Sequence, residues 1–265
     1  MRDTVNLQPR NQGSIHLIQI TDPHILGDPD DRFDGVDTSA TLEAVIAAIN
    51  DLDNPPDLVL VTGDLTHEPE PAAYERLALR LQRLGAPVFC LPGNHDDPAM
   101  MHERLNRANI TTRKAITAEN WRLLLLDTRE AGTHGGRLSR AELDFLRDSL
   151  EQSAEDNILI ALHHPPVSIA SPWMDAMGLA NPQDFFAVID EYPVVRAVIW
   201  GHIHQEFRQR RGGVEMYGTP STCVQFRPGA DHYIKDKLPP GFRHLFLHSE
   251  GCLQTRIRRL HSPAG

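Results

Sequence analysis

Short apolar runs alternate with amphipathic stretches over the first 200 residues of the chain. The runs have the length of buried strands, and glycine, proline, asparagine or aspartate bounds most of them. They predict strands at residues 14–21, 57–62, 88–91, 121–126, 158–162 and 194–200.

Between these runs, apolar residues recur at the spacing of one helical face. This pattern predicts helices at residues 38–50, 71–84, 98–106 and 139–152, and a further helix that begins at residue 181. Gly85 is expected to end the second helix, and Ser139 with Glu142 matches a capping box that opens the fourth. Asn181 is the expected cap of the last helix, with Pro182 in its first turn.

The pattern changes after residue 200. Residues 213–218 and 242–248 resemble antiparallel strands, with turns expected at residues 212–213 and 239–241. Strands that alternate with helices, followed by hairpins, indicate an α/β fold with sheets flanked by helices. We expect an N-terminal extension at residues 1–13, one domain at residues 14–260 and a short C-terminal tail at residues 261–265.

Polar residues of a few types follow the predicted strands directly. Because the carboxyl ends of neighbouring parallel strands meet at one edge of a sheet, these side chains are expected to converge there. The residues at these strand ends are Asp22, His24, Asp64, Asn94, His95, His163, His202 and His204.

These strand-end residues combine carboxylate, amide and imidazole groups. Such a mixed nitrogen and oxygen set suits manganese, iron, zinc or cobalt, and it lacks the thiolates of a structural zinc site. Seven of these eight residues, all except His95, are counted as ligands; seven are too many for one tetrahedral ion, but they fit two ions that share a bridging carboxylate. The sequence therefore predicts a dinuclear metal site.

Composition limits the partners and the cellular location that are expected for the protein. The formal net charge of -10 argues against a nucleic-acid surface, which needs a basic footprint. The 3 cysteines form no C-x-x-C pair and suggest no disulfide framework, so a cytoplasmic location is expected. Residues 1–13 contain no apolar signal-peptide core, and no apolar run is long enough to span a bilayer.

The ordered motifs D-x-H, GD, GNHD, H-x-P and GHxH resemble the calcineurin-like metallophosphoesterase superfamily. Residues 18–24 (IQITDPH), 201–206 (GHIHQE) and 219–226 (TPSTCVQF) are similar, more narrowly, to bacterial class III cyclic-AMP phosphodiesterases. The resemblance implies a four-layer α/β/β/α sandwich of two mixed sheets flanked by helices.

The resemblance also implies roles for individual residues. Asp64 would bridge two divalent ions. Iron or manganese is expected for these ions, and zinc or cobalt is the alternative. The H-x-P register selects His163 rather than His164 as a ligand. The first ion would be held by Asp22, His24, Asp64 and His204, and the second by Asp64, Asn94, His163 and His202.

The same resemblance implies a catalytic role for His95, as an acid that is not a metal ligand and that Asp96 would orient. A hydroxide generated between the ions would attack phosphorus, and His95 would protonate the leaving 3′-oxygen. The substrate would be 3′,5′-cyclic AMP and the product 5′-AMP. Residues expected to contact the substrate are His24, Asn94, His95 and His204.

Two alternatives to this function remain at the level of sequence. The substrate could be another small diester, such as a 2′,3′-cyclic nucleotide or a glycerophosphodiester, because loops set specificity. A non-catalytic scaffold is the more remote alternative, since it would not need the complete ligand set. The expected partner is a small cyclic nucleotide, with no nucleic acid or membrane, and the chain is expected to be a monomer or a homodimer.

Several other residues could have either a functional or a purely structural role. Trp173 and Met174 could stack on a base or simply pack in their loop, residues 166–180. The aspartates of residues 25–37 are expected to form a solvated acidic loop rather than a metal site. Surface positions are expected for His134 and His232 and for the basic residues near the C-terminus. The residues that could line a substrate pocket or pack in a strand are Thr222, Cys223 and Gln225.

Overall fold

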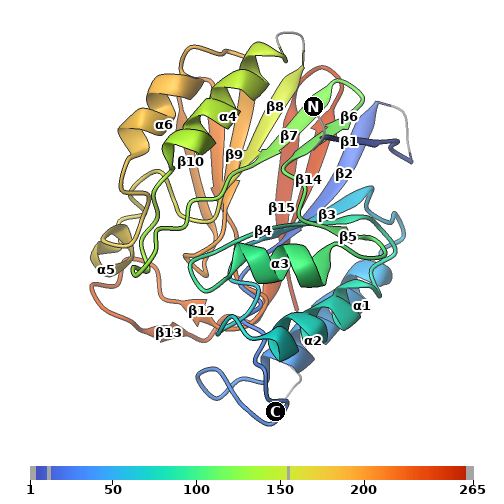
Figure 1. Cartoon of the computed structure of the whole chain (residues 1–265), viewed down its shortest axis with the longest axis vertical. Helices are drawn as coiled ribbons and strands as arrows, with labels where there is room; N and C mark the ends of the chain where they lie inside the picture. Colours follow the sequence, from blue (N-terminus) through green and yellow to red (C-terminus); the bar gives the residue numbers. More distant parts are fainter. Residues whose placement is uncertain (1–3, 11–12, 154–155, 261–265) are drawn as a thin grey trace.

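Two β-sheets pack face to face in the computed structural model, which describes residues 4–10, 13–153 and 156–260 (Figure 1). The six-stranded sheet has the order β15 (Leu253–Arg259), β14 (Gly241–His248), β2 (Ser14–Ile20), β3 (Leu58–Thr62), β4 (Val88–Leu91) and β5 (Ile110–Thr111). The seven-stranded sheet has the order β1 (Thr4–Leu7), β6 (Ala115–Ala118), β7 (Trp121–Leu125), β8 (Asn157–Ala161), β9 (Val195–Trp200), β11 (Val214–Gly218) and β10 (Phe207–Arg211). A small hairpin pairs β12 (Gln225–Phe226) with β13 (Lys235–Asp236).

Both sheets are mixed. Strands β2, β3, β4 and β5 are parallel, whereas β14 pairs antiparallel with both β2 and β15. In the other sheet, β7, β8, β9 and β11 are parallel, and β10 returns antiparallel along β11. The central strands β3, β4 and β8 are buried at every position, which explains their continuous apolar runs.

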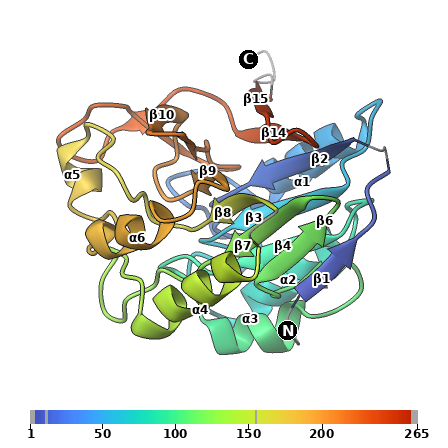
Figure 2. The same ribbon diagram turned by 90° about the horizontal axis from the view of Figure 1, so that it is seen from above.

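Helices cover the outer faces of both sheets. Helices α1 (Thr38–Asn50), α2 (Pro71–Leu81) and α3 (Pro98–Leu105) share an apolar core with the six-stranded sheet. Helices α4 (Arg140–Glu151), α5 (Pro172–Asp175) and α6 (Pro182–Ile189) share a second core with the seven-stranded sheet, and Figure 2 shows α4 and α6 together on one side.

A third apolar core lies between the sheets and includes Leu17, Leu58 and Phe89 from one sheet with Leu123, Leu159 and Ile199 from the other. Three cores separate four layers, so the predicted α/β/β/α sandwich is confirmed. Among the described residues, no helix is both long enough and apolar enough to cross a membrane.

Three local predictions were wrong in detail. Helix α2 ends at Leu81 rather than at residue 84, and Gln82 caps it before a turn that leads to Gly85. The loop at residues 166–180 contains the short helix α5. No turn is assigned at residues 239–241, where the chain instead enters β14.

The capping predictions were right in position but incomplete in mechanism. The Ser139 side chain accepts the Glu142 backbone N–H at 3.2 Å, as a cap should. The Glu142 side chain does not complete the box, because it accepts the Asp127 backbone N–H at 3.1 Å and pairs with Lys114. Asn181 likewise caps no helix N–H, and its Oδ1 instead accepts the Leu138 N–H at 2.9 Å.

The N-terminal segment contains a strand that the sequence did not indicate. Residues Thr4–Leu7 form β1, which pairs parallel with β6 at the edge of the seven-stranded sheet. Only Leu7 in this strand is buried, so its sequence carries little apolar pattern. This part of the expected extension is therefore joined to the fold, while the expected tail at residues 261–265 lies outside the described residues.

Candidate metal centre

The strand-end residues of the two sheets meet at one end of the sandwich. Asp22 and His24 follow β2, Asp64 follows β3 and Asn94 follows β4. His163 follows β8, and His202 with His204 follows β9. The chain continues the parallel register beyond the strands, because the backbone N–H groups of Asp22 and His24 donate to the carbonyls of Gly63 and Asp64 at 3.1 and 3.0 Å. The structure thus brings together residues that lie up to 182 positions apart (204 - 22).

Five of these residues have a left-handed backbone. The φ angles are 51° at Asp22, 43° at His24, 47° at Asp64, 66° at His202 and 48° at His204. This conformation is uncommon for residues other than glycine and costs free energy. It bends the chain sharply at the strand ends, and the bend directs these side chains into a shared space.

One group of side chains comprises Asp22, His24 and His204, all buried, with ligand atoms within 4.8 Å of one another. The Nε2 atoms of His24 and His204 are 3.2 Å apart, and His204 Nε2 is 3.4 Å from Asp22 Oδ1. His204 Nδ1 lies 2.8 Å from the Val224 carbonyl, so it is the donor nitrogen and Nε2 keeps a lone pair. Such a ring is oriented to bind a cation through Nε2.

A second group comprises Asp22, Asp64 and His163, which are also buried. His163 Nε2 is 3.3 Å from Asp64 Oδ1 and 3.2 Å from Asn94 Oδ1, while its Nδ1 lies 2.9 Å from the Thr62 carbonyl. Asp64 also faces the first group, because its Oδ2 is 3.5 Å from His24 Nε2. Asp64 therefore lies between the two groups.

His202 joins the second group from β9. Its backbone N–H donates to both carboxylate oxygens of Asp22 at 3.0 and 3.1 Å, which ties the two sheets together. Its Nε2 is buried and has no hydrogen-bond partner among the described residues. A buried nitrogen without a partner is costly, and a bound cation would satisfy it. The residues present therefore fit divalent metal ions.

Glycines permit the close approach of these loops. A Cβ atom on Gly93 would lie 2.2 Å from both the backbone nitrogen and Oδ1 of Asp64. A Cβ atom on Gly201 would lie 2.0 Å from Thr21 Oγ1 and 2.7 Å from Asp22 Oδ2. Both glycines belong to the sequence motifs, and here the structure shows why a side chain is excluded.

Burial and charge oppose each other in this cluster. Burial alone would raise the pKa of Asp64, but the facing imidazoles, His163 first, hold it well below its usual range. Burial alone would lower the pKa of His163, but Asp64 and Asp22 raise it to about 9. Burial lowers the pKa of His24 and His202 well below the usual histidine value. Near neutral pH the His24 and His202 imidazoles are therefore neutral, which is the form that binds metals, whereas His163 carries a proton that a bound metal ion would displace.

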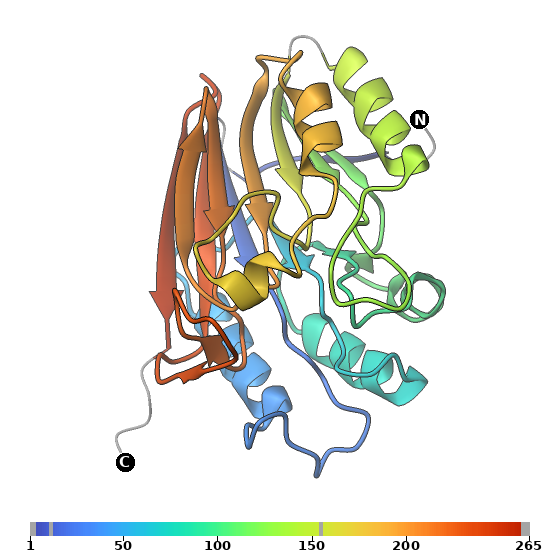
Figure 3. The same ribbon diagram turned by 90° about the vertical axis from the view of Figure 1, so that its left-hand side faces the viewer.

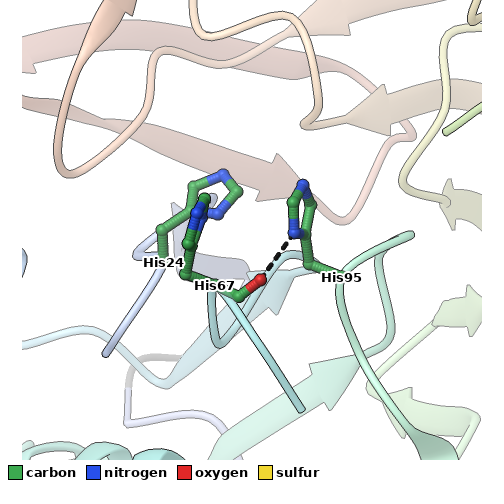
Figure 4. A group of neighbouring side chains, drawn as sticks. All are labelled: His24, His67 and His95. Atoms are coloured by element: carbon green, nitrogen blue, oxygen red, sulfur yellow. Dashed lines mark hydrogen bonds between the residues drawn. The ribbon is translucent and has the colours of Figure 1, made fainter. Parts of the chain in front are cut away.

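His95 lies beside the cluster and is oriented by the backbone. The backbone N–H of His95 donates to Asp64 Oδ1 at 3.0 Å. The ring Nδ1 of His95 lies 2.7 Å from the His67 carbonyl oxygen (Figure 4). The His67 ring stacks on the His95 ring with centroids 5.2 Å apart, and both rings lie near His24. His67 was not predicted from the sequence, although its place three residues after Asp64 in the same loop was a signal.

The prediction that Asp96 orients His95 was wrong. The Asp96 carboxylate accepts the backbone N–H groups of Gly93, Leu65 and Thr66 at 2.9, 3.0 and 3.3 Å. It also accepts the Tyr74 hydroxyl at 3.1 Å. Asp96 therefore fastens the loop after β4 to the loop after β3 and to α2, and the His67 carbonyl takes the place expected for Asp96.

His164 and His134 contact each other beside the cluster. Both ring nitrogens of His164 face the protein, at 2.7 Å from Thr128 Oγ1 and 3.2 Å from the His134 carbonyl. His134 is exposed, as expected, but it does have partners: its Nδ1 lies 3.4 Å from Asn94 Nδ2 and its ring lies 5.6 Å from that of His95. His134 is brought to the site by a loop after β7, with no nearby motif to indicate it.

A pocket of about 210 Å³ opens onto the cluster. Trp173 and Met174 line it, whereas Thr222, Cys223 and Gln225 are absent from its lining and Phe226 stands there instead. Phe33 was not predicted to line the pocket either, and it comes from the mostly exposed acidic loop. The lining comprises His24, Phe33, Asp64, Asn94, His95, His134, Trp173, Met174, Met177, His202, His204 and Phe226.

Comparison with solved structures identifies the same architecture. A dimetal phosphatase from Danio rerio superposes with a TM-score of 0.65 at 15% identity, covering 92% of this chain and 99% of that one. GAP50, the anchor in the inner membrane complex of Plasmodium, gives a TM-score of 0.64 at 12% identity, covering 94% of this chain and 85% of that one. At these identities the likeness concerns the fold.

Sequence relatives are much closer. The chain is 38% identical to the 3′,5′-cyclic adenosine monophosphate phosphodiesterase CpdA of Pseudomonas aeruginosa, over 95% of this chain and 92% of that one. It is 40% identical to a 3′,5′-cyclic-nucleotide phosphodiesterase of Nostoc, over 93% and 92%. The family model described as calcineurin-like phosphoesterase matches residues 15–206. The chain therefore belongs to the calcineurin-like phosphoesterase family.

Proposed function

We propose that the chain hydrolyses 3′,5′-cyclic AMP to 5′-AMP at a dinuclear metal centre. The observation that carries this proposal is the buried cluster of carboxylates and imidazoles that both sheets contribute at one end of the sandwich. Relatives named as cyclic-AMP phosphodiesterases, at 35–38% identity over most of the chain, support the substrate.

The two groups of side chains support the proposed division of ligands. Asp22, His24 and His204 would hold one ion, and Asn94, His163 and His202 would hold the other, with Asp64 shared. The contacts of His164 favour His163 as the ligand, because both nitrogens of His164 already face protein groups. The mixed nitrogen and oxygen set suits manganese, iron, zinc or cobalt, and the resemblance to the family supports iron or manganese as the first choice.

Bound divalent ions would lower the pKa of water and neutralise charge on the phosphoryl oxygens. The chain itself supplies the proton for the leaving group. Because His95 Nδ1 faces the His67 carbonyl, Nε2 is the nitrogen left to donate a proton to the 3′-oxygen as the P–O3′ bond breaks. The four residues proposed to contact the substrate all line the pocket: His24, Asn94, His95 and His204.

Kinetics with three diesters test this proposal. The protein purified with manganese or iron is assayed with cyclic AMP, 2′,3′-cyclic AMP and bis-p-nitrophenyl phosphate, beside Asn94→Ala and His95→Ala. We expect cyclic AMP to have the highest kcat/KM and both variants to lose about 100-fold or more. His95→Ala should lose less on bis-p-nitrophenyl phosphate, because p-nitrophenolate leaves without a proton. His102→Ala, an exposed histidine on α3, is the matched control.

Each result decides a separate part of the proposal. Turnover of the artificial diester alone would overturn the cyclic-AMP assignment. Full activity in both variants would overturn the site, and full activity after metal removal would overturn the dinuclear mechanism. A preference for 2′,3′-cyclic AMP would identify the alternative substrate class.

We also propose a cytoplasmic location and a monomeric or homodimeric state, with a single domain at residues 14–260. The free thiols of Cys90, Cys223 and Cys252 are consistent with a reducing compartment. The net charge of -10 supports a small-molecule partner rather than nucleic acid.

A further inference from the structure

The pocket beside the proposed metal centre has aromatic walls that the hydrolytic chemistry does not use. Phe33 lies against His24 with ring centroids 4.9 Å apart, and Phe226 stacks on His204 at 4.0 Å with an angle of 4°. Since the His24 and His204 rings are 5.2 Å apart, the two phenylalanines flank this histidine pair. Trp173 extends the wall on the Phe226 side, with centroids 5.3 Å apart.

Both walls are held by local structure. The backbone groups of Phe33 and Val36 exchange two hydrogen bonds, at 2.9 and 3.0 Å, around Asp34 and Gly35, whose φ angles are 49° and 75°. This is the geometry of a tight two-residue turn, so Phe33 is fixed although its loop is exposed. On the other wall, the Phe226 N–H donates to the His204 carbonyl at 3.1 Å.

Tyr233 connects the two walls. Its ring packs edge-on against Trp173 and Phe226, at 5.9 and 5.4 Å, and its hydroxyl donates to Asp34 Oδ2 at 2.6 Å. Lys235 also donates to the Asp34 carbonyl, at 2.7 Å. Figure 3 shows α5, which contains Trp173, beside the β12–β13 hairpin, which contains Phe226 and Lys235. The acidic loop, the hairpin and α5 thus form one frame around the pocket.

We propose that Phe33, Trp173 and Phe226 form the nucleobase subsite of this pocket and that Tyr233 positions them. This inference rests on the proposed function, because a cyclic nucleotide presents its phosphate to the histidines and must place its base nearby. All three aromatic rings line the pocket and are only half-buried. Met174 and Met177 add polarisable lining, and the carboxylate there, Asp64, faces the histidines. A flat, neutral, aromatic group is the chemistry that such walls bind.

Inhibition measurements test the subsite separately from cyclic-AMP turnover. Hydrolysis of methyl p-nitrophenyl phosphate, which carries no base, is inhibited with 5′-AMP or with ribose 5-phosphate. In the wild type, 5′-AMP should bind about 10-fold or more tightly than ribose 5-phosphate, since stacking on aromatic side chains is worth a factor of this order. Phe33→Ala and Trp173→Ala should reduce this ratio to about 2 or less.

Cyclic-AMP kinetics give the second measurement. The same variants should raise KM for cyclic AMP by about 10-fold with little change in kcat. Trp173→Phe keeps a ring and should restore most of the affinity, while Tyr233→Phe removes only the bond to Asp34 and should raise KM about 2- to 3-fold. Phe145→Ala, a half-buried phenylalanine on α4, is the matched control.

The two proposals fail in different ways. A wild type that does not hydrolyse cyclic AMP overturns the proposed function, and the inhibition ratio still decides the subsite. Equal inhibition by 5′-AMP and ribose 5-phosphate overturns the subsite, as does a ratio that survives both alanine substitutions. A fall in kcat for cyclic AMP as large as the rise in KM would show that the aromatic residues support the metal centre rather than a base.

Discussion

Several residues at the strand ends leave little room for substitution. Asp64 has a left-handed backbone, contacts three of the neighbouring loops and lies between the two groups of ligand atoms. Gly93 allows the loop after β4 to reach it, and Asp96 holds that loop in place. These residues are therefore constrained by the short distances to their neighbours, which the sequence does not show.

Gly93→Ala tests this constraint. The new methyl group would lie 2.2 Å from Asp64, so the loops must separate. We expect metal content and kcat/KM to fall sharply, with a loss of about 1–3 kcal/mol in the free energy of unfolding. Metal analysis and urea unfolding measure the two effects. Gly213→Ala is the control, because no atom lies within 4 Å of its Cβ position; similar losses in both variants would contradict the explanation.

At the scale of elements, β2 links the site to the antiparallel part of its sheet. Its carboxyl end leads to Asp22, while near its start His16 contacts His244 on β14. His16 Nε2 and His244 Nδ1 are 3.0 Å apart, and the rings are stacked at 5.3 Å. One neutral ring donates to the other, so the pair joins two strands while both rings are uncharged.

This pair predicts a pH dependence of stability. Burial lowers the pKa of His16, and burial together with His16 lowers the pKa of His244 to about 4, from 6.5. The unfolded chain therefore binds more protons than the folded protein between pH 6.5 and about 4. The stability from the neutral pair is present above pH 6.5 and is lost as the pH falls toward 4, by about 1–2 kcal/mol.

Denaturant unfolding at several pH values checks this effect. His244→Phe keeps a ring in the stack and removes the titration, so it should flatten the decline of stability between pH 6.5 and 4. His232→Phe, at an exposed histidine, should leave the decline unchanged. An equal decline in wild type and His244→Phe would assign the effect to other groups.

At the scale of the whole molecule, the proposed metal centre bridges the two sheets. Ligands come from β2, β3 and β4 in one sheet and from β8 and β9 in the other, so bound ions would link both halves of the sandwich. A ligand that binds only the folded state stabilises it, by an amount that grows with the logarithm of the free ligand concentration above Kd. Folding and metal binding should therefore be coupled.

Thermal unfolding measures that coupling. Adding manganese to the metal-depleted protein should raise Tm by about 5 °C or more, since a few kcal/mol of binding free energy corresponds to such a shift. Asp64→Asn, which weakens the shared ligand, should lose most of the increase. An equal increase in both proteins would mean that the ions bind elsewhere.

Strand identity and ligand candidates could be predicted from sequence because both depend on local order along the chain, whereas the four-layer order followed from the resemblance to a known family. The apolar runs indicate buried strands, and the position directly after each run places Asp22, Asp64, Asn94, His163 and His202 at one edge. The edge strand β1 could not be predicted, because a four-residue strand with one buried side chain has no distinctive pattern.

Only the tertiary structure decided what surrounds the site. Phe33, His67 and His134 come from loops and Phe226 from β12, all far apart in sequence, and no periodicity relates them. The His67 carbonyl, rather than Asp96, orients His95, and sequence patterns do not distinguish one backbone carbonyl from another. The sequence by itself determined the strands and the chemistry at their ends, because burial and motif spacing are local. The packing of loops decided the pocket walls, because contacts between distant segments depend on how both sheets come together.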